Sequence, residues 1–334
     1  MPNQRELARH LSLSQGTVSL ALRNSPLINE ETRNRVRREA AALGYFPNPQ
    51  VASLMSHIRS GRKVREQGCI ALLVDFESEA DWLGFHPAYV QQYEAMRDRA
   101  SLRGYRTECF FLRAPGMSPA KVDRVLYSRG IVGVILAGPR KDASYPIELR
   151  WERYACGKAG YTWEEPRVDC VTANNRQHVE LAFRKLEENG CRRIGYCISR
   201  QMIPRADSNW VAGYLLSQRK LAAASRVPMF VTDYTPAGRA RFRKWLERWK
   251  PDAVIGGLTE KEWLSSSPLR KKPVFCFRFR RPDTSDYAID ENDSVIGETL
   301  CDLVIEQIIH NKRGIPTYPR LIQIGGSWYE PLPV

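Results

Sequence analysis

The sequence predicts a small all-helical head followed by a larger α/β body that contains two parallel sheets. Helix signals fill about the first 45 residues, whereas apolar runs alternate with amphipathic segments from Gly68 onward. The chain has 334 residues, which is more than one hydrophobic core usually organises. With 43% hydrophobic and 26% charged residues, it has the composition of an ordinary globular protein.

Three short helices are expected in the head. Asn3, with Glu6 three residues later, is typical of a helix start. A second helix restarts at Ser14 after a gap so short that the two helices must cross steeply. Asn29 is expected to cap a third helix over residues 30–43. These features predict a helix-turn-helix domain over residues 1–46.

Residues 47–67 are predicted to form a hinge helix and linker. Prolines at positions 47 and 49 interrupt the pattern, and residues 50–59 then resume helical spacing. A helix isolated in this way has no core of its own. It needs a partner, which is a second copy of the chain, the DNA groove, or both.

The body, residues 68–334, alternates between strands and helices, as expected for parallel sheets covered on both faces. Strands are expected at 70–76, 106–112, 131–136, 193–198, 229–232, 253–256, 274–277 and 320–324. Helices are expected at 88–103, 121–128, 178–189, 209–223, 238–249 and 294–310. The repeated alternation predicts two doubly wound sheets of similar size.

Charge and cysteine content narrow the class of protein. The net charge is +14, and residues 1–66 hold eleven basic and five acidic side chains. A basic head suits a polyanionic partner, because neutralised phosphates release condensed counterions.

The eight cysteines are scattered without zinc-site spacing, so we expect reduced, mostly buried thiols. With neither a signal segment nor a membrane span recognisable, we expect a cytoplasmic protein.

The residues of the head resemble the lactose-repressor (LacI/GalR) family of bacterial regulators. The resemblance covers the first 54 residues at the family's spacing, through Glu6-Leu7-Ala8-Arg9, Ser14 with Thr17-Val18-Ser19, Asn29-Glu30-Glu31-Thr32-Arg33, Leu43-Gly44-Tyr45 with Pro47-Asn48, and Ser53-Leu54. The body matches more loosely, at Asn174-Asn175, Gly190-Cys191-Arg192-Arg193-Ile194, Ala212-Gly213-Tyr214, Pro251-Asp252-Ala253-Val254 and Gly297.

The resemblance implies a two-lobed body like that of periplasmic sugar-binding proteins, with crossing connections and a ligand cleft. Its first lobe is expected at residues 68–163 and 292–318, and its second at 164–291 and 319–334. It also implies a homodimer that binds double-stranded operator DNA at a near-palindromic site and responds to a small-molecule, carbohydrate-related effector, as a ligand-responsive repressor.

The resemblance makes residues 14–22 the recognition helix in the major groove. Gln15 is the best candidate for reading a base, while Ser14, Thr17 and Ser19 are better placed for phosphates. Gly16 and Leu20 stand where many relatives carry longer polar side chains. The complete set expected at the DNA is Ser14, Gln15, Gly16, Thr17, Ser19, Leu20, Asn29, Thr32, Tyr45, Asn48, Val51 and Leu54.

The hinge departs from the family pattern in an informative way. Leu54 aligns with the leucine that relatives insert into the minor groove, and dimer packing alone is the alternative role. Relatives usually have Gly-Arg about three residues after this leucine, whereas Gly61-Arg62 arrives about four residues later here. Four residues add roughly one helical turn, about 6 Å. We therefore predict an atypical branch with a lengthened hinge helix.

Effector contacts are expected where loops converge at the carboxyl ends of the sheet strands. Mapped through the resemblance, they fall at His86, Asn209, Trp210, Tyr234, Thr259 and Arg278. Trp210 replaces an arginine of most sugar-binding relatives, which argues against a simple hexose. Each residue has an ordinary core or surface role as its alternative.

No catalytic or metal-binding constellation is recognisable, and we expect neither an enzyme nor a cofactor or metal site. The chain lacks GxGxxG, GxSxG and HExxH, and the acidic run at residues 290–293 lacks the glycine of an EF-hand loop. Two alternatives to a regulator are a small-molecule binding protein without a DNA function and an enzyme on a doubly wound fold. The basic head argues against the first alternative, and the missing motifs argue against the second.

Overall fold

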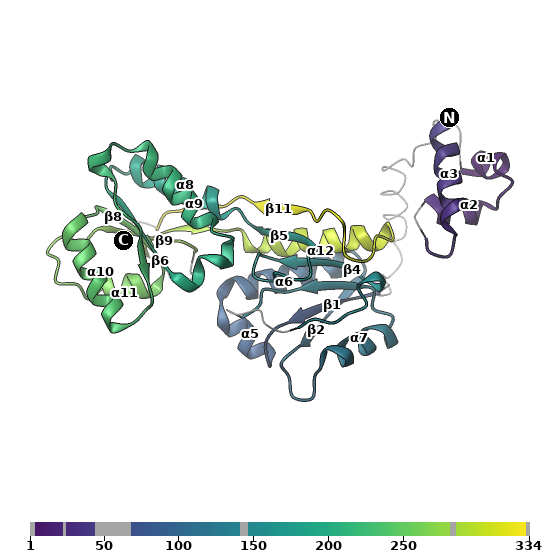
Figure 1. The fold of residues 1–334 in the computed structure, drawn as a ribbon, viewed down its shortest axis with the longest axis horizontal. Coiled ribbons are helices and arrows are strands. Elements are labelled where there is room, and N and C mark those ends of the chain that lie inside the picture. The colour runs from purple at the N-terminus through teal and green to yellow at the C-terminus, as the bar shows by residue number, and fades with distance from the viewer. Residues whose placement is uncertain (1–3, 23–24, 44–67, 141–145, 281–284, 332–334) are drawn as a thin grey trace.

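The computed structural model describes residues 4–22, 25–43, 68–140, 146–280 and 285–331, which form a three-helix head and two α/β lobes (Figure 1). The hinge and linker prediction for residues 47–67 lies outside the described residues. So do four residues predicted to contact DNA, namely Tyr45, Asn48, Val51 and Leu54.

The head contains α1 (Gln4–His10), α2 (Gln15–Leu22) and α3 (Glu30–Ala42), within two residues of the predicted ranges. The turn between α1 and α2 is closed by the Leu13 amide, which donates to the Ala8 carbonyl at 2.9 Å. As predicted, Asn29 caps α3, because its Oδ1 accepts from the Thr32 amide at 2.8 Å. The buried core comprises Leu7, Ala8, Leu11, Val18, Ala21, Val36 and Ala40.

The first lobe is a six-stranded sheet in the order β11-β5-β4-β3-β1-β2, in which every neighbouring pair is parallel. Its strands are β1 (Gly68–Val74), β2 (Tyr105–Phe111), β3 (Gly133–Leu136), β4 (Ala155–Ala159), β5 (Asp169–Ala173) and β11 (Leu321–Ile324). Its helices are α5 (Glu79–Phe85), α6 (Pro87–Leu102), α7 (Pro119–Ser128) and α12 (Asp293–Ile309). Helices α6 and α12 contribute to one core cluster and α7 to another, so both faces of the sheet are covered.

The second lobe repeats this architecture with the strand order β12-β10-β9-β8-β6-β7, in which only β12 runs antiparallel to its neighbour. Its strands are β6 (Ile194–Ser199), β7 (Phe230–Thr232), β8 (Ala253–Gly256), β9 (Val274–Phe277), β10 (Tyr287–Asp290) and β12 (Ser327–Tyr329). Its helices are α8 (Asn175–Glu188), α9 (Asn209–Lys220), α10 (Pro236–Trp249) and α11 (Leu258–Ser265). Short 3-10 turns occupy Trp151–Arg153, Arg200–Met202, Pro204–Ala206 and Ala223–Ser225.

The predicted lobe boundaries are wrong at two places. The ranges 164–291 and 319–334 were assigned to the second lobe, but β5 and β11 pair with each other in the first sheet. The chain crosses between lobes only after each of these strands has ended, because the carboxyl ends of the parallel strands lie at the edge that faces the other lobe. The first lobe therefore extends to about residue 174 and includes residues up to 324.

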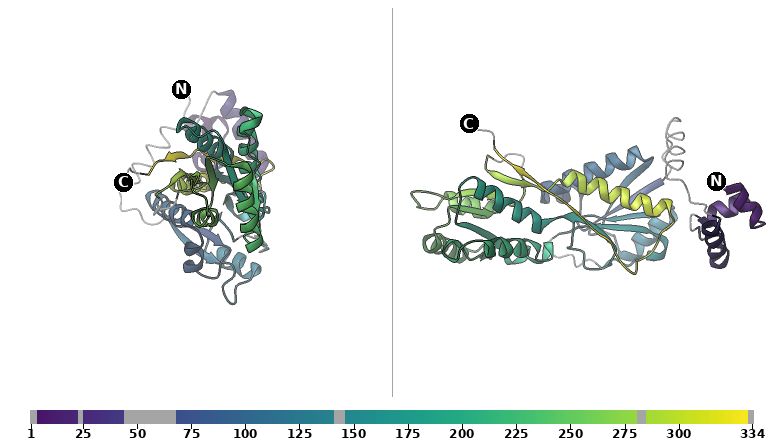
Figure 2. Two further views of the ribbon diagram at one scale, coloured as in Figure 1. Left: turned by 90° about the vertical axis from the view of Figure 1, so that its left-hand side faces the viewer. Right: turned by 90° about the horizontal axis from the view of Figure 1, so that it is seen from above.

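Three chain segments connect the lobes, and hydrogen bonds join them to one another. The Asn174 amide donates to the Ile324 carbonyl at 2.8 Å. The Asn292 side-chain amide donates to the Gly325 carbonyl, also at 2.8 Å. The crossing segments therefore form one continuous connection, and the view from above shows the lobes lying end to end along it (Figure 2).

Two further sequence expectations bear on the body. Six of the eight cysteines are buried and two are half-buried, which confirms the prediction of mostly buried thiols. Within the described ranges, no helix is both long enough and apolar enough to span a membrane.

Candidate functional site

A cavity of about 460 Å³ lies between the two lobes. The first lobe contributes the loop around His86, the start of α6, and the carboxyl ends of β3, β4 and β5. The second lobe contributes the turns after β6, β8 and β9. Ligand sites in open α/β sheets form at such strand ends, because the loops there converge. This cavity is therefore the candidate ligand site of the body.

Four of the six residues predicted for the cleft line this cavity, namely His86, Trp210, Tyr234 and Arg278. Asn209 and Thr259 are not among its lining residues. The Asn209 side chain donates to the Ala206 carbonyl at 2.8 Å, and Thr259 lies in the first turn of α11, where its neighbour Leu258 takes the cavity position.

Arg278 is the most buried cation of the cavity, with 5% of its surface exposed. Its Nη1 donates to the Cys197 carbonyl at 2.6 Å, and its guanidinium lies 6.0 Å from the centre of the Trp210 ring. The Nε atom has no hydrogen-bond partner. A buried donor left unpaired costs free energy, which indicates that a ligand acceptor completes this position.

Part of the cavity lining is acidic. Asp293, the first residue of α12, accepts a hydrogen bond from the Gln92 side chain at 2.8 Å. Glu291 lies beside it, with 12% of its side chain exposed. Burial, followed by repulsion from Glu291, raises the pKa of Asp293 to about 7.

Arg205 lines the cavity and bridges the two lobes. It belongs to the second lobe, whereas its hydrogen-bond acceptors belong to the first. Its Nη2 donates to the Tyr89 hydroxyl at 3.2 Å and to the Pro139 carbonyl at 3.4 Å, and its Nη1 donates to the Arg140 carbonyl at 3.1 Å. The rings of His86 and Phe279 make a second interlobe contact, with centroids 4.7 Å apart.

Sequence reasoning missed several cavity residues that the fold brings together. These are Tyr89, Gln92, Asn175, Arg205, Phe279, Glu291 and Asp293. The acidic run at residues 290–293 was considered as an EF-hand loop and set aside. One signal was available for it: the run directly precedes the long helix predicted at residues 294–310.

The first turn of α2 presents short polar groups on the surface of the head. Ser14, Gln15 and Gly16 are exposed, Thr17 and Leu20 are half-buried, and the Ser19 side chain is outside the described set. Ser14 Oγ accepts from the Thr17 amide at 2.9 Å and lies 2.8 Å from the Thr17 hydroxyl. The Ser14 hydroxyl therefore caps the helix, and the Thr17 hydroxyl is hydrogen-bonded to it. Asn29 is exposed and Thr32 is half-buried at the start of α3.

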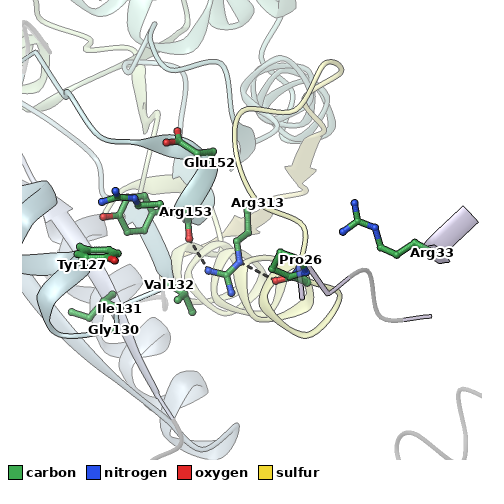
Figure 3. A pocket seen from close by; sticks show the side chains of 11 residues that line it. Pro26, Arg33, Tyr127, Gly130, Ile131, Val132, Glu152, Arg153 and Arg313 are labelled. Carbon is green, nitrogen blue, oxygen red and sulfur yellow. Dashed lines mark hydrogen bonds between the residues drawn. The ribbon is translucent and has the colours of Figure 1, made fainter. Parts of the chain in front are cut away.

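A second cavity, of about 560 Å³, is lined by residues of both the head and the first lobe (Figure 3). On the lobe side, Arg313 donates to the Arg153 carbonyl at 2.7 Å and to the Asn311 side chain at 3.0 Å. The Arg153 guanidinium lies 4.2 Å from the centre of the Tyr127 ring. These cations are held by neighbouring groups, so the interlobe cavity is the better ligand candidate.

Comparison with known proteins yields relatives of a single kind, although no protein-family model matches the chain. The HTH-type transcriptional regulator GalS of Salmonella typhimurium strain LT2 is 28% identical over 213 residues, which is 60% of this chain and 54% of GalS. The HTH-type transcriptional regulator CelR of Thermobifida fusca is 26% identical over 198 residues, 58% of this chain and 54% of CelR. The chain thus spans about half the length of the curated relatives it matches.

Solved structures agree over nearly the whole length. The transcriptional regulator CelR–cellobiose complex superposes with a TM-score of 0.56 at 18% identity, and the lac repressor dimer bound to operator and the anti-inducer ONPF with 0.53 at 16%. Each match covers 98% of both chains. The curated relatives and the shared fold thus support the resemblance of this chain to regulators of the lactose-repressor (LacI/GalR) family.

Proposed function

We propose that this protein is a sequence-specific, DNA-binding transcriptional repressor that acts as a homodimer and responds to a small-molecule effector. One observation carries the proposal. The same chain contains a three-helix head, whose α2 is polar and exposed, and a two-lobed body with a cavity between its lobes. Its relatives are transcriptional regulators, which favours this reading over a small-molecule binding protein or an enzyme.

In this proposal α2 enters the major groove and positions its first turn over the base edges. Gln15 is exposed there, and its amide suits bidentate recognition of adenine. Ser14 caps α2 and its hydroxyl is hydrogen-bonded to that of Thr17, so both hydroxyl oxygens are already ordered when they face the groove. The DNA backbone is contacted by Asn29, Thr32, Tyr45 and Asn48. The hinge contributes Val51 and Leu54.

The body binds the effector and changes its lobe arrangement in response. An effector in the cavity contacts both lobes, so it favours one lobe arrangement over the other, and that difference is the free energy available for switching. Two proteins of this fold are known in complex with small molecules, CelR with cellobiose and the lac repressor with ONPF. A homodimer with two equivalent heads calls for a near-palindromic operator.

Selection of bound DNA from a random pool tests the proposal directly. We expect enrichment of a near-palindrome and an affinity that falls steeply with salt, because several phosphates are neutralised. Gln15→Ala should cost roughly 1–3 kcal/mol on the selected site and relax the preference at one base pair of each half-site. Pools without any enriched palindrome would overturn the proposal.

Leu54→Ala tests the hinge. If Leu54 inserts into the minor groove, the variant should lose affinity for the selected site while binding to random DNA changes little. Equal losses on both kinds of DNA would assign Leu54 to dimer packing instead.

A further inference from the structure

The acidic wall of the interlobe cavity, defined as Asn175, Glu291 and Asp293, has no counter-charge of its own. Among the residues that the structure describes, no arginine or lysine nitrogen lies within 4 Å of either carboxylate. The neighbouring Asp290, by contrast, is paired with Arg280 at 2.9 Å. Glu291 and Asp293 therefore place two acidic groups at the cavity surface, where burial and their mutual repulsion disfavour ionisation of Asp293 until a cation binds.

The polar groups around this wall do not supply the missing cation. Gln92 donates one neutral hydrogen bond to Asp293. His178 approaches Glu291 at 3.5 Å, but neither ring nitrogen makes a hydrogen bond, and His178 is not among the lining residues. Arg205, a cavity arginine of the second lobe, is directed to the Tyr89 hydroxyl and two backbone carbonyls.

Asn175 provides a second, independent sign of a ligand. It lines the cavity with 5% of its surface exposed, and its Oδ1 atom has no hydrogen-bond partner. An unpaired buried acceptor costs about as much as a lost hydrogen bond, so a donor from a ligand is expected there. The acidic wall thus offers two carboxylates and one amide oxygen, and all three accept hydrogen bonds.

An ammonium group matches this set of acceptors, because it carries one positive charge and three N–H donors. The rest of the cavity fits a small ring compound. Trp210 and Tyr234 of the second lobe and Phe85 and Tyr89 of the first supply aromatic surface, and a volume of about 460 Å³ is within the range of small-ligand pockets.

We propose that the effector is a hydroxylated ring compound with a protonated amino group, such as an amino sugar, and that this group binds at Asn175, Glu291 and Asp293. The inference rests on the proposed function, since it names the ligand of the same cavity. The hydroxyls face Gln92 and Arg278, and Arg278 Nε donates to one of them.

The test is calorimetric titration of the full-length protein with matched pairs of ligands. The probes are glucosamine, galactosamine and mannosamine, each compared with its neutral parent glucose, galactose or mannose. We expect at least one amino sugar to bind about ten-fold or more tightly than its parent, which corresponds to one charge-assisted hydrogen bond. No such preference in any pair, including the absence of binding altogether, would overturn the inference.

Variants then locate the amino group. Asp293→Asn and Glu291→Gln keep the shape of each side chain but remove its charge, so each should reduce the preference for the amino sugar to about three-fold or less. The loss of affinity should be larger for the amino sugar than for its neutral parent. Glu298→Gln is the matched control, because Glu298 lies exposed on the same helix and does not line the cavity. A preference that survives both cavity variants would contradict the assignment.

Binding to the selected operator is measured on the same preparations. A protein that binds its operator but prefers neutral sugars leaves the proposed function intact and removes only the amine inference. A protein that binds amino sugars but selects no DNA site would overturn the proposed function and leave the assignment of the amino group to the cavity intact.

Discussion

Gly16 occupies the second position of α2, although glycine is among the weakest helix formers. No described residue of the head requires it. A Cβ built on Gly16 would lie 3.6 Å from Ser14 Oγ, which is ordinary contact, and its backbone is not left-handed. The absence of an internal reason favours an external one, namely close approach of the DNA backbone to the start of α2.

Gly16→Ala separates these two reasons. We expect the variant head to be more stable by about 0.5–1 kcal/mol, because alanine loses less backbone entropy on folding. Affinity for the selected operator should fall at the same time, as a methyl group would hold the helix away from the DNA. Thermal unfolding and gel-shift titration measure the two effects. A variant that gains stability and keeps its affinity would show that the glycine has no role at the DNA.

Asp293 should make the stability of the ligand-free protein depend on pH. Burial and the neighbours Glu291 and Asp290 raise its pKa from 3.8 to about 7, while the Gln92 hydrogen bond and His178 act in the opposite direction. Between these two values the folded protein holds a proton that the unfolded chain lacks. The contribution of Asp293 to the free energy of unfolding therefore decreases as the pH rises through this range.

Asp293→Asn removes this titration. The variant should gain stability relative to the parent when the pH is raised from 5 to 8, by roughly 1–2 kcal/mol. Urea unfolding at the two pH values measures the difference. The same difference at both values would show that Asp293 does not titrate in this range.

At the scale of elements, close helix packing positions the acidic wall. Helix α12 begins at Asp293 and crosses α6, which carries Gln92. Gly297 makes the crossing possible, because a Cβ there would overlap the Gln92 backbone carbonyl well inside van der Waals contact. The glycine thus holds two cavity residues at hydrogen-bond distance.

Gly297→Ala should therefore cost about 1–3 kcal/mol of stability, since overpacking forces the helices apart. It should also weaken binding of any cavity ligand, because the distance between Gln92 and Asp293 changes. Gly84→Ala is a suitable control: Gly84 lies in α5 with no atom within 4 Å of a built Cβ. Equal stability for the two variants in urea unfolding would contradict the packing argument.

The elements that the sequence predicted well are those with a periodic pattern of their own. The prediction for α12 was shifted by one residue, and the strand at residues 274–277 matched β9. Strands β4, β5, β10 and β12 were missed. The β4 segment Ala-Cys-Gly-Lys-Ala is fully buried but contains small residues and a lysine, because α12 packs closely over Gly157 and Lys158 donates to the Trp163 carbonyl. Such a strand depends on its tertiary partners and carries little local signal.

The cavity was predictable only in part for the same reason. Trp210, Tyr234 and Arg278 follow strand ends or start helices that the sequence located. Arg205 lies in a 3-10 turn without periodicity, and its role depends on acceptors more than sixty residues earlier in the chain. Asn175 and Asp293 become neighbours of the cavity only through the crossing segments.

At the scale of the whole molecule, Arg205 is the contact best placed to control the lobe arrangement. Its three hydrogen bonds reach from the second lobe to the first. Arg205→Ala should favour a more open body and weaken effector binding, because the lobes lose a charge-assisted connection of about 1.5–3 kcal/mol. Small-angle scattering would report the change as a larger radius of gyration. An unchanged scattering profile together with an unchanged effector affinity would show that Arg205 does not control the lobe arrangement.

The three crossings also determine how this protein can be recombined. Each lobe is assembled from separate stretches of chain, and β11 returns to the first sheet more than 140 residues after β5. No single cut releases a complete lobe, so exchanging one lobe between related genes would have to replace several stretches at once. The head is contiguous and can be exchanged at one junction. One crossover at that junction therefore joins a different head to the complete body, whereas a change confined to one lobe of the cavity needs substitutions or several exchanges at once.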